Sequence, residues 1–163
     1  MTRKYELKQR AERLAETRTR IVEATVALHA SAGPAHTTIS AIAERAGVQR
    51  HTVYAHFQDE RKLFDACSAH WAALHPFPDP ARWAAIEDPK KRLREALNAV
   101  YEWYDRAGDD LRIFKRDSGT HSTTAELVAR RERALLAHRD ALAVGWSRRK
   151  ALKAAIGHAL ELE

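Results

Sequence analysis

The sequence predicts an all-α protein, in which an N-terminal group of short helices precedes a C-terminal group of longer ones. Its 163 residues include 31 Ala and 15 Leu, but Val and Ile together number only 13. Ala and Leu lead the helix-propensity ranking, whereas β-branched residues favour strands. No stretch alternates apolar and polar residues between turn signals, as a half-buried strand would. We therefore expect helices throughout.

Charge and composition limit the class of protein. Lys and Arg number 28 against 22 Asp and Glu, which gives a net charge of +6, and 45% of the residues are apolar. This balance excludes a disordered tail. The sequence has no apolar run long enough to cross a membrane, no signal-peptide pattern, and a single cysteine that cannot form an internal disulfide. We expect a soluble, cytoplasmic protein with no membrane association.

The N-terminal half begins with a basic segment and a long helix. Residues 1–14 are polar and basic, which predicts a mobile arm or a frayed helix start. The first firm helix is expected from about Ala15 to Ala32, because apolar residues repeat at i, i+3, i+4 and i+7 from Ile21 onwards. Gly33 and Pro34 then end it.

Three further helices complete an N-terminal domain over residues 15–75. Thr37 and Thr38 can cap a short helix that ends at Gly47. A second short helix is expected over about 50–57, and a longer linking helix over about 60–74. Because helices this short are unstable alone, they must pack on their longer neighbours.

A proline-rich segment over residues 76–88 is the predicted linker to a C-terminal domain over residues 89–163. There we expect a helix over about 89–107 that ends at Gly108, and a short helix from Asp109 to about Asp117. Two longer helices should follow over about 124–144 and 147–163. The last one reaches Glu163 with no capping signal, which suggests that the whole protein continues beyond it.

Residues 36–64 carry the most informative pattern, HTTISAIAERAGVQRHTVYAHFQDERKLF. Ala43 is a small residue within the first short helix, so it allows a close approach by the second. Gly47, four positions later, suits a left-handed turn, and Val53 faces inward from the second helix. This spacing predicts a helix-turn-helix motif.

The outer face of the second helix carries side chains that suit DNA. Arginine matches the acceptor pair of guanine in the major groove, and threonine offers a hydroxyl to phosphate and a methyl group to thymine. The N–H groups at helix starts suit phosphate oxygens. The predicted DNA contacts are Thr37, Thr38, Gln49, Arg50, His51, Thr52, Tyr54, His56 and Lys62.

The segment GVQRHTVYAHFQDERKLF, preceded by TTISAIAERA, resembles the DNA-binding domain of tetracycline-repressor (TetR) family transcription regulators. The resemblance covers about residues 18–65. The sequence departs from the family at Gln49, where Ser is common, and at His51, where Gly is frequent; both departures bear on operator preference. The resemblance implies a homodimer that binds an inverted-repeat operator in double-stranded DNA. It also implies a C-terminal helical domain that binds a small-molecule effector.

Large aromatic residues in the C-terminal half are core candidates, yet some of them suit an effector pocket, which is typically apolar with a few polar groups. We expect such a pocket at Trp103, Tyr104, Phe114 and His121. Trp103 lies off the main apolar face of its helix, so it faces the pocket, a dimer partner or solvent. The helices over about 124–144 and 147–163 are the predicted dimer interface, because two long helices per subunit can form a four-helix bundle.

The excess of positive charge is not concentrated in the N-terminal half, because residues 1–75 and residues 76–163 each carry a net charge of +3. The first 20 residues carry 7 basic and 3 acidic side chains, a net charge of 7 − 3 = +4. This arm either contacts phosphates or the minor groove, or is a solvated tail.

Other classes of site find little support. The pairs His51/His56 and His70/His75 are five residues apart rather than the four that suit a metal on one helix face, so no metal site or cofactor is expected. The sequence has no Gly-rich phosphate loop and no G-x-S-x-G elbow, so no catalytic residues are expected and an enzyme is disfavoured. The remaining alternative is an architectural or regulatory DNA-binding protein without an effector.

Overall fold

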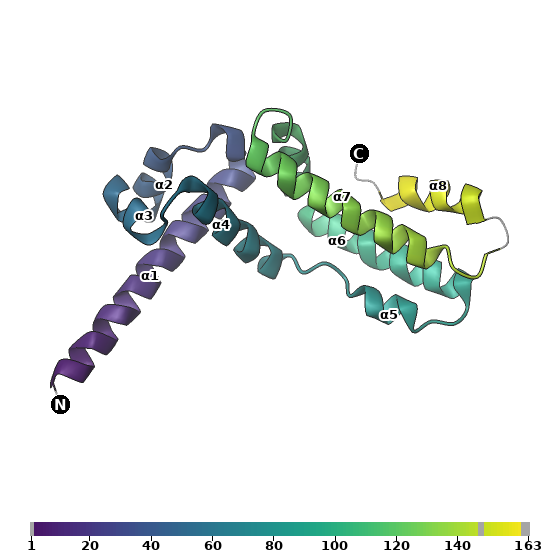
Figure 1. Cartoon of the computed structure of the whole chain (residues 1–163), viewed down its shortest axis with the longest axis horizontal. Helices are drawn as coiled ribbons and strands as arrows, with labels where there is room; N and C mark the ends of the chain where they lie inside the picture. Colours follow the sequence, from purple (N-terminus) through teal and green to yellow (C-terminus); the bar gives the residue numbers. More distant parts are fainter. Residues whose placement is uncertain (1, 147–148, 161–163) are drawn as a thin grey trace. The chain divides into compact units, whose positions relative to one another are not determined.

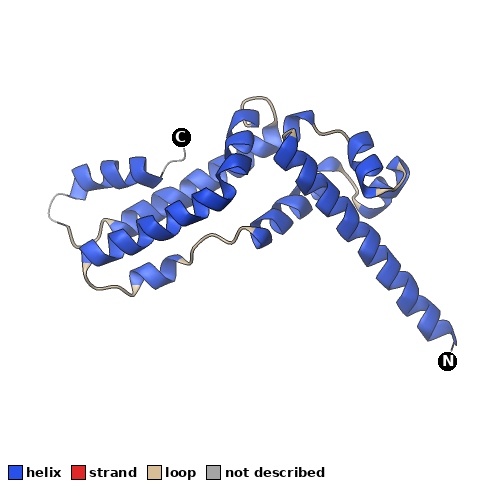
Figure 2. Cartoon of the chain, turned by 180° about the vertical axis from the view of Figure 1, so that it is seen from behind, coloured by secondary structure: helices blue, strands red, loops and turns tan. Residues whose placement is uncertain are grey.

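The computed structural model describes residues 2–146 and 149–160, and every regular element within these ranges is a helix (Figure 2). The chain forms two compact units that divide between Leu74 and His75. No helix of the described ranges combines the length and apolar character that a bilayer crossing requires. Unit 1 contains α1 (Thr2–Ser31), the 3-10 helix η1 (Pro34–His36), α2 (Ile39–Ala46), α3 (Arg50–His56) and α4 (Glu60–Leu74) (Figure 1).

The core of unit 1 lies where the C-terminal half of α1 packs against α2 and α4. Ile21 is fully buried, and Val53 of α3 is 1% exposed. Ala43 on α2 and Leu63 on α4 are also buried in this cluster. Burial of these apolar side chains holds the short helices α2 and α3 in place, since neither would be stable alone.

The segment 1–14 that was predicted as a mobile arm or frayed start is helical from Thr2 onwards and continues into α1. Local contacts support it: the Gln9 side chain donates to the Tyr5 hydroxyl at 2.9 Å, and Lys8 lies 3.8 Å from Glu12. The prediction relied on apolar periodicity, which this part of the helix lacks because none of its described side chains is buried.

Unit 2 is built around two long helices that run side by side, α6 and α7, with α5 and α8 packed on them (Figures 1 and 2). The most deeply buried side chains of α6 include Ala96 and Val100, both 0% exposed. The helices are α5 (Pro80–Ala84), α6 (Pro89–Asp117), α7 (Ser122–Leu142) and α8 (Arg149–Leu160). The predicted last helix also included residues 147, 148 and 161–163, which lie outside the described residues.

Gly108 does not end a helix, because α6 continues without a break to Asp117 and buries Gly108 inside it. The short helix predicted from Asp109 is therefore the last part of α6. A glycine inside a helix costs about 1 kcal/mol relative to alanine, a cost that burial of the surrounding apolar face can offset. On the same helix Trp103 is 3% exposed, so it faces the core of unit 2 rather than solvent.

The proline-rich segment 76–88 is not a simple linker, because it contains α5. The carboxylate of Asp79 accepts the backbone N–H of Ala81 at 3.0 Å and caps the helix, and Pro80 occupies its first turn, where proline is favoured. Trp83 of α5 is buried, with its ring edge-on to Phe77 at 6.3 Å and to His138 of α7 at 6.2 Å. Pro80 thus begins a helix within the segment that the sequence predicts to be a linker.

A buried arginine joins three parts of unit 2. Arg92 is 8% exposed, and its guanidinium donates to the carbonyl of Ile86 at 3.0 Å and to the carbonyl of Val144 after α7. The next residue, Gly145, has φ +88°, and a Cβ atom there would lie 2.8 Å from the Pro89 ring. The turn after α7 is thus fixed against the start of α6.

Candidate nucleic-acid interface

The helix-turn-helix motif is formed by α2, a tight turn and α3. Thr38 begins α2, where its hydroxyl oxygen accepts the backbone N–H of Ala41 at 3.2 Å. Gly47 ends α2 with φ 65° and ψ 40°, a left-handed conformation in which glycine has no Cβ penalty. The backbone N–H of Val48 returns to the carbonyl of Ala43 at 2.9 Å, so the turn is closed.

Helix α3 buries one side and presents the other to solvent. Val53 is its buried residue, while Arg50, His51 and Tyr54 are exposed, Tyr54 at 44%. Gln49, which precedes the helix as its N-cap, is exposed and makes no side-chain capping bond. Thr52 and His56 are half-buried. The outward face therefore offers a row of hydrogen-bonding groups in the form that a major groove accepts.

Arg50, His51 and Tyr54 have side chains with no hydrogen bond or ion pair to the part of the chain that the structure describes. Their donors and acceptors are consequently available to a partner. Water satisfies the hydrogen bonds of an exposed polar face, so such a face does not reduce the stability of the fold. The same groups can exchange this water for base edges or phosphates.

The two threonines before α2 differ in their hydrogen bonds. Thr37 is half-buried, and its hydroxyl donates to the carbonyl of Gly33 at 2.8 Å. The Thr37 proton is therefore used within the chain, which weakens the prediction that this side chain donates to a phosphate. Thr38 is exposed and uses its oxygen as an acceptor, so its hydroxyl proton can still be donated.

Lys62 lies exposed in the first turn of α4. Its backbone N–H is already capped by the Asp59 carboxylate at 2.7 Å, so the side chain rather than the helix end is what remains for a phosphate. Asp59 was not foreseen, although an aspartate three residues before Lys62 is a recognisable capping signal.

One arginine of α1 lies at the end of α3, and another lies beside the turn that precedes it. The guanidinium of Arg18 is 4.8 Å from the ring centroid of Phe57, the C-cap residue of α3. A terminal nitrogen of Arg20 would be 3.8 Å from a Cβ atom at Gly47. The sequence shows that these residues are basic, but only the packing of α1 shows that they lie beside Phe57 and Gly47.

A buried cysteine and histidine lie behind the motif. The sulfur of Cys67 is 3.4 Å from Nδ1 of His29, and both residues are buried. Burial raises the pKa of the Cys67 thiol to about 12, because the thiolate would be poorly solvated there. A protonated thiol of this kind is a core residue rather than a nucleophile. Groups of three or more potential metal ligands are absent from the described residues.

The residues predicted to bind an effector lie in unit 2. Trp103 and Tyr104 form a tilted pair with ring centroids 5.3 Å apart, and both are buried. The guanidinium of Arg131 lies 5.0 Å from the Trp103 ring and donates to the Tyr104 hydroxyl at 3.2 Å. Phe114 is buried, and His121 caps α7 by accepting the N–H of Thr124 at 3.3 Å.

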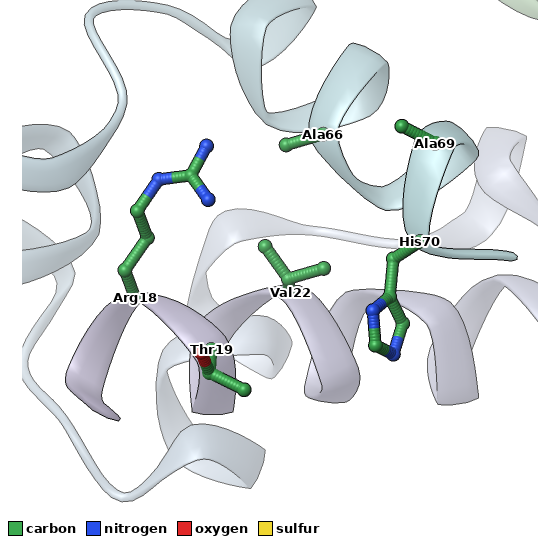
Figure 3. Close-up of a pocket in the computed structure, with 6 residues that line it drawn as sticks. All are labelled: Arg18, Thr19, Val22, Ala66, Ala69 and His70. Carbon is green, nitrogen blue, oxygen red and sulfur yellow. The ribbon is translucent and has the colours of Figure 1, made fainter. Parts of the chain in front are cut away.

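A cleft of about 290 Å³ lies in unit 1, between α1 and α4 (Figure 3). The short side chains of Ala66 and Ala69 leave this space, and Val22 of α1 forms its apolar floor. The cleft is distant in sequence from the predicted effector residues, which belong to the other unit. It is lined by Arg18, Thr19, Val22, Ala66, Ala69 and His70.

Residues 21–67 match the family described as bacterial regulatory proteins, tetR family. Within the N-terminal unit this segment is similar to the tetR family. The matched residues run from the first buried position of α1, Ile21, to Cys67 in α4, so they include the whole helix-turn-helix. The tetR family consists of regulatory proteins, not enzymes.

Relatives with curated descriptions align over more of the chain than this segment. A protein of Escherichia coli strain K12, described as a probable acrEF/envCD operon repressor, is 33% identical over 83 residues. The protein of the same description in Escherichia coli O157:H7 matches equally. The alignment covers 50% of this chain but only 38% of either relative.

Solved structures share the fold over most of the chain. A Clostridium perfringens protein described as a fatty acid metabolism regulator superposes with a TM-score of 0.63 at 16% identity, covering 86% of this chain and 81% of its own. A transcriptional regulator from Rhodococcus sp. Rha1 gives a TM-score of 0.58 at 20% identity, covering 88% of this chain and 81% of its own. At these identities the likeness concerns the fold alone, and it extends beyond the tetR-family segment.

Proposed function

We propose that the protein is a sequence-specific, DNA-binding transcriptional regulator that acts as a repressor in the cytoplasm. The observation that carries this proposal is the exposed face of α3, whose hydrogen-bonding side chains have no partner in the described chain and sit in a tetR-family helix-turn-helix. Repression is preferred to activation because the Escherichia coli relatives are described as repressors.

The proposed DNA contacts divide by role. Arg50 and its neighbours on α3 would read base edges in the major groove, where arginine recognises guanine. Residues at helix starts would hold phosphates and fix the position of α3. The residues proposed to contact phosphates are Thr38, Lys62 and Thr37, although the Thr37 hydroxyl already donates within the chain. The residues proposed to face the bases, on α3 or directly before it, are Gln49, Arg50, His51, Thr52, Tyr54 and His56.

We propose that two copies of the chain pair through α7 and α8, which would present two α3 helices to the DNA. Helix α7 has 21 residues, yet its buried residues are only Thr124 and Leu142 among those described. Leu136 and Val144 are each 48% exposed. A second copy can cover such a surface by forming a four-helix bundle. Two α3 helices would then meet an inverted repeat with half-sites about 34 Å apart, one turn of DNA.

The proposed effector would bind in unit 2 near Trp103, Tyr104, Phe114 and His121. The rings supply apolar surface, and Arg131 supplies a partly buried cation beside them. Because an effector can shift a conformational equilibrium only through different affinities for its states, it must bind the DNA-free arrangement more tightly.

Selection from a random duplex library, at about 150 mM salt with non-specific competitor DNA, tests the proposal because salt weakens non-specific binding. We expect an inverted repeat for the whole chain and a weaker or altered motif for Arg50→Ala. Recovery of no motif would overturn sequence-specific regulation and favour the architectural alternative. The selected repeat then serves as the probe in a search for small molecules that release the protein.

A further inference from the structure

The first part of α1 projects beyond the other helices of unit 1 (Figure 1). Its described side chains from Tyr5 to Arg20 are exposed, except for half-buried Gln9 and Thr17. We call residues 2–20 the α1 extension. At a rise of 1.5 Å per residue the extension is about 28 Å long. A helical segment that no core stabilises is marginal in water, so a binding partner would strengthen it.

Arginines share one face of this extension. Arg10, Arg13 and Arg20 follow one another at intervals of three and seven residues, which places them on the same side of a helix. None of their guanidinium groups forms an ion pair with a described residue. Glu6 also belongs to this face, four residues before Arg10, but no ion pair joins the two in the described structure.

Acidic residues gather on a different face. Glu12, Glu16 and Glu23 are spaced by four and seven residues, and Lys8 pairs with Glu12 on that side. A helix that is merely solvated usually mixes the two signs along each face. Neither face is uniform, because Glu6 lies among the arginines and Lys8 among the glutamates, but the first 20 residues carry a net charge of 7 − 3 = +4, which favours a negatively charged partner.

The arginine face of the extension continues into the helix-turn-helix. Arg20 lies beside Gly47, in the turn that precedes α3, and Arg18 lies over Phe57, at the end of α3. Arg20 of the arginine face therefore lies beside the turn that precedes α3, and Arg13 and Arg10 continue this face away from the turn along the extension. A duplex held against α3 would carry its phosphates past this face.

We propose that the α1 extension is a second DNA-binding element, in which Arg10 and Arg13 bind phosphates of the duplex that flanks the bases read by α3. This inference rests on the proposed function of α3. Guanidinium groups suit phosphate because they can donate two parallel hydrogen bonds. The bound phosphates extend the contacted DNA without adding sequence preference.

A second copy of the chain fits the extension less well than DNA does. Leu7 and Leu14 are exposed at 61% and 51%, and they are seven residues apart, as in one row of a coiled coil. The companion row falls on positions 11 and 18, which hold Ala11, a small side chain that buries little apolar surface, and the charged Arg18. Arg18 already stacks on Phe57, so it would interrupt the apolar contact row between two paired helices.

The test compares the double variant Arg10→Gln, Arg13→Gln with the matched control Lys8→Gln, which removes a cation from the other face. Glutamine keeps a helix propensity similar to that of arginine, and far-ultraviolet circular dichroism checks that the helix is retained. Affinity for the selected duplex is measured by fluorescence anisotropy at several salt concentrations. The slope of log K against log salt is negative. Its magnitude should decrease by about 1.8 in the double variant, about 0.9 for each lost phosphate contact, and should not change in the control.

Hydroxyl-radical footprinting gives the second readout. The protected DNA should be shorter for the double variant, while the selected bases remain the same. An unchanged slope and footprint would overturn the proposal. So would a Leu7→Ala, Leu14→Ala variant that lowers the oligomeric state with no change in the salt slope, since that identifies a second copy as the partner. Failure of the wild type to select any motif would instead count against α3, because the salt slopes of the variants can be compared on any duplex.

Discussion

Arg50 is an exposed cation at the start of α3, with no partner in the described chain. If it reads a base, Arg50→Ala should cost about 1–3 kcal/mol of binding free energy and relax the preference at one position of the operator. Titration of the selected duplex and of single-base variants measures both effects. Arg112→Ala is the control, because Arg112 is exposed in unit 2 and pairs with Asp109.

Lys62 supplies the comparison for Arg50. As a phosphate contact it should affect all duplexes alike, so Lys62→Ala should weaken binding evenly and lower the salt slope by about one. Loss of preference at one base pair in Lys62→Ala, or an even loss in Arg50→Ala, would reverse the two assignments.

Cys67 offers a test of the core behind the motif. Burial raises its pKa from 9.0 to about 12, so the native thiol stays protonated where an unfolded one ionises. The folded form therefore binds more protons than the unfolded form between pH 9 and about 12, and stability falls as the pH rises through this window. Urea unfolding at several pH values measures the free energy of unfolding of the wild type and of Cys67→Ala. Only the wild type should show the decrease that depends on the thiol.

Reactivity of the same thiol is a second readout. A disulfide reagent at pH 8 should modify Cys67 only after denaturant is added, because attack requires an exposed thiolate. Rapid labelling of the native protein would show that the thiol is not buried as described.

Individual residues of the candidate site differ in how far the sequence could predict them. The exposed face of α3 follows from the position of Val53, because one buried residue fixes which side of a short helix faces outward. The hydrogen bond of Thr37 to Gly33 and the stacking of Arg18 on Phe57 depend on how distant segments pack. No local pattern encodes such contacts.

Among the elements, those with local boundary signals were predicted closely. Thr38 and Gly47 mark the two ends of α2, and the turn before Glu60 separates α3 from α4. The α1 extension and the unbroken α6 were not predicted, because neither boundary is marked by a local sequence signal. Helix α1 continues without apolar periodicity, and α6 passes through Gly108 because its buried face extends across that residue.

Helix α5 shows that the segment between the predicted domains belongs to a folded unit. Trp83 is 5% exposed and contacts Phe77 and His138, so Trp83→Ala should destabilise unit 2 by about 3–5 kcal/mol. Thermal unfolding followed by circular dichroism measures the loss. The neighbouring exposed residue Arg82 provides the control, and Arg82→Ala should change the stability of unit 2 little. Equal stability of both variants would mean that α5 is not docked.

For the whole molecule, the proposed dimer makes a prediction about mass. The 18.5 kDa chain should sediment at twice that mass. Leu136→Glu places a charge on the exposed side of α7, so it should raise the dimer dissociation constant more than tenfold, because a buried unpaired charge costs well over 1.4 kcal/mol. Leu74→Glu, at a residue 59% exposed in unit 1, is the matched control.

The operator gives a functional measure of the same assembly. A dimer binds two half-sites at once, so its affinity for the full repeat should greatly exceed that for one half. Leu136→Glu should lose most of this advantage while the wild type and Leu74→Glu keep it. A wild-type chain that sediments as a monomer while bound to the full repeat would contradict dimerisation through α7.

The contact of Arg92 with the carbonyl of Val144 also bears on how unit 2 folds and is degraded. The two residues are 52 positions apart, so the contact closes a long loop and should form late in folding. In the native protein the same contact, together with Gly145 against Pro89, holds the end of α7 to the start of α6. Its opening frees the segment after α7 while α6 stays folded, so limited proteolysis should first cut the chain after Leu142.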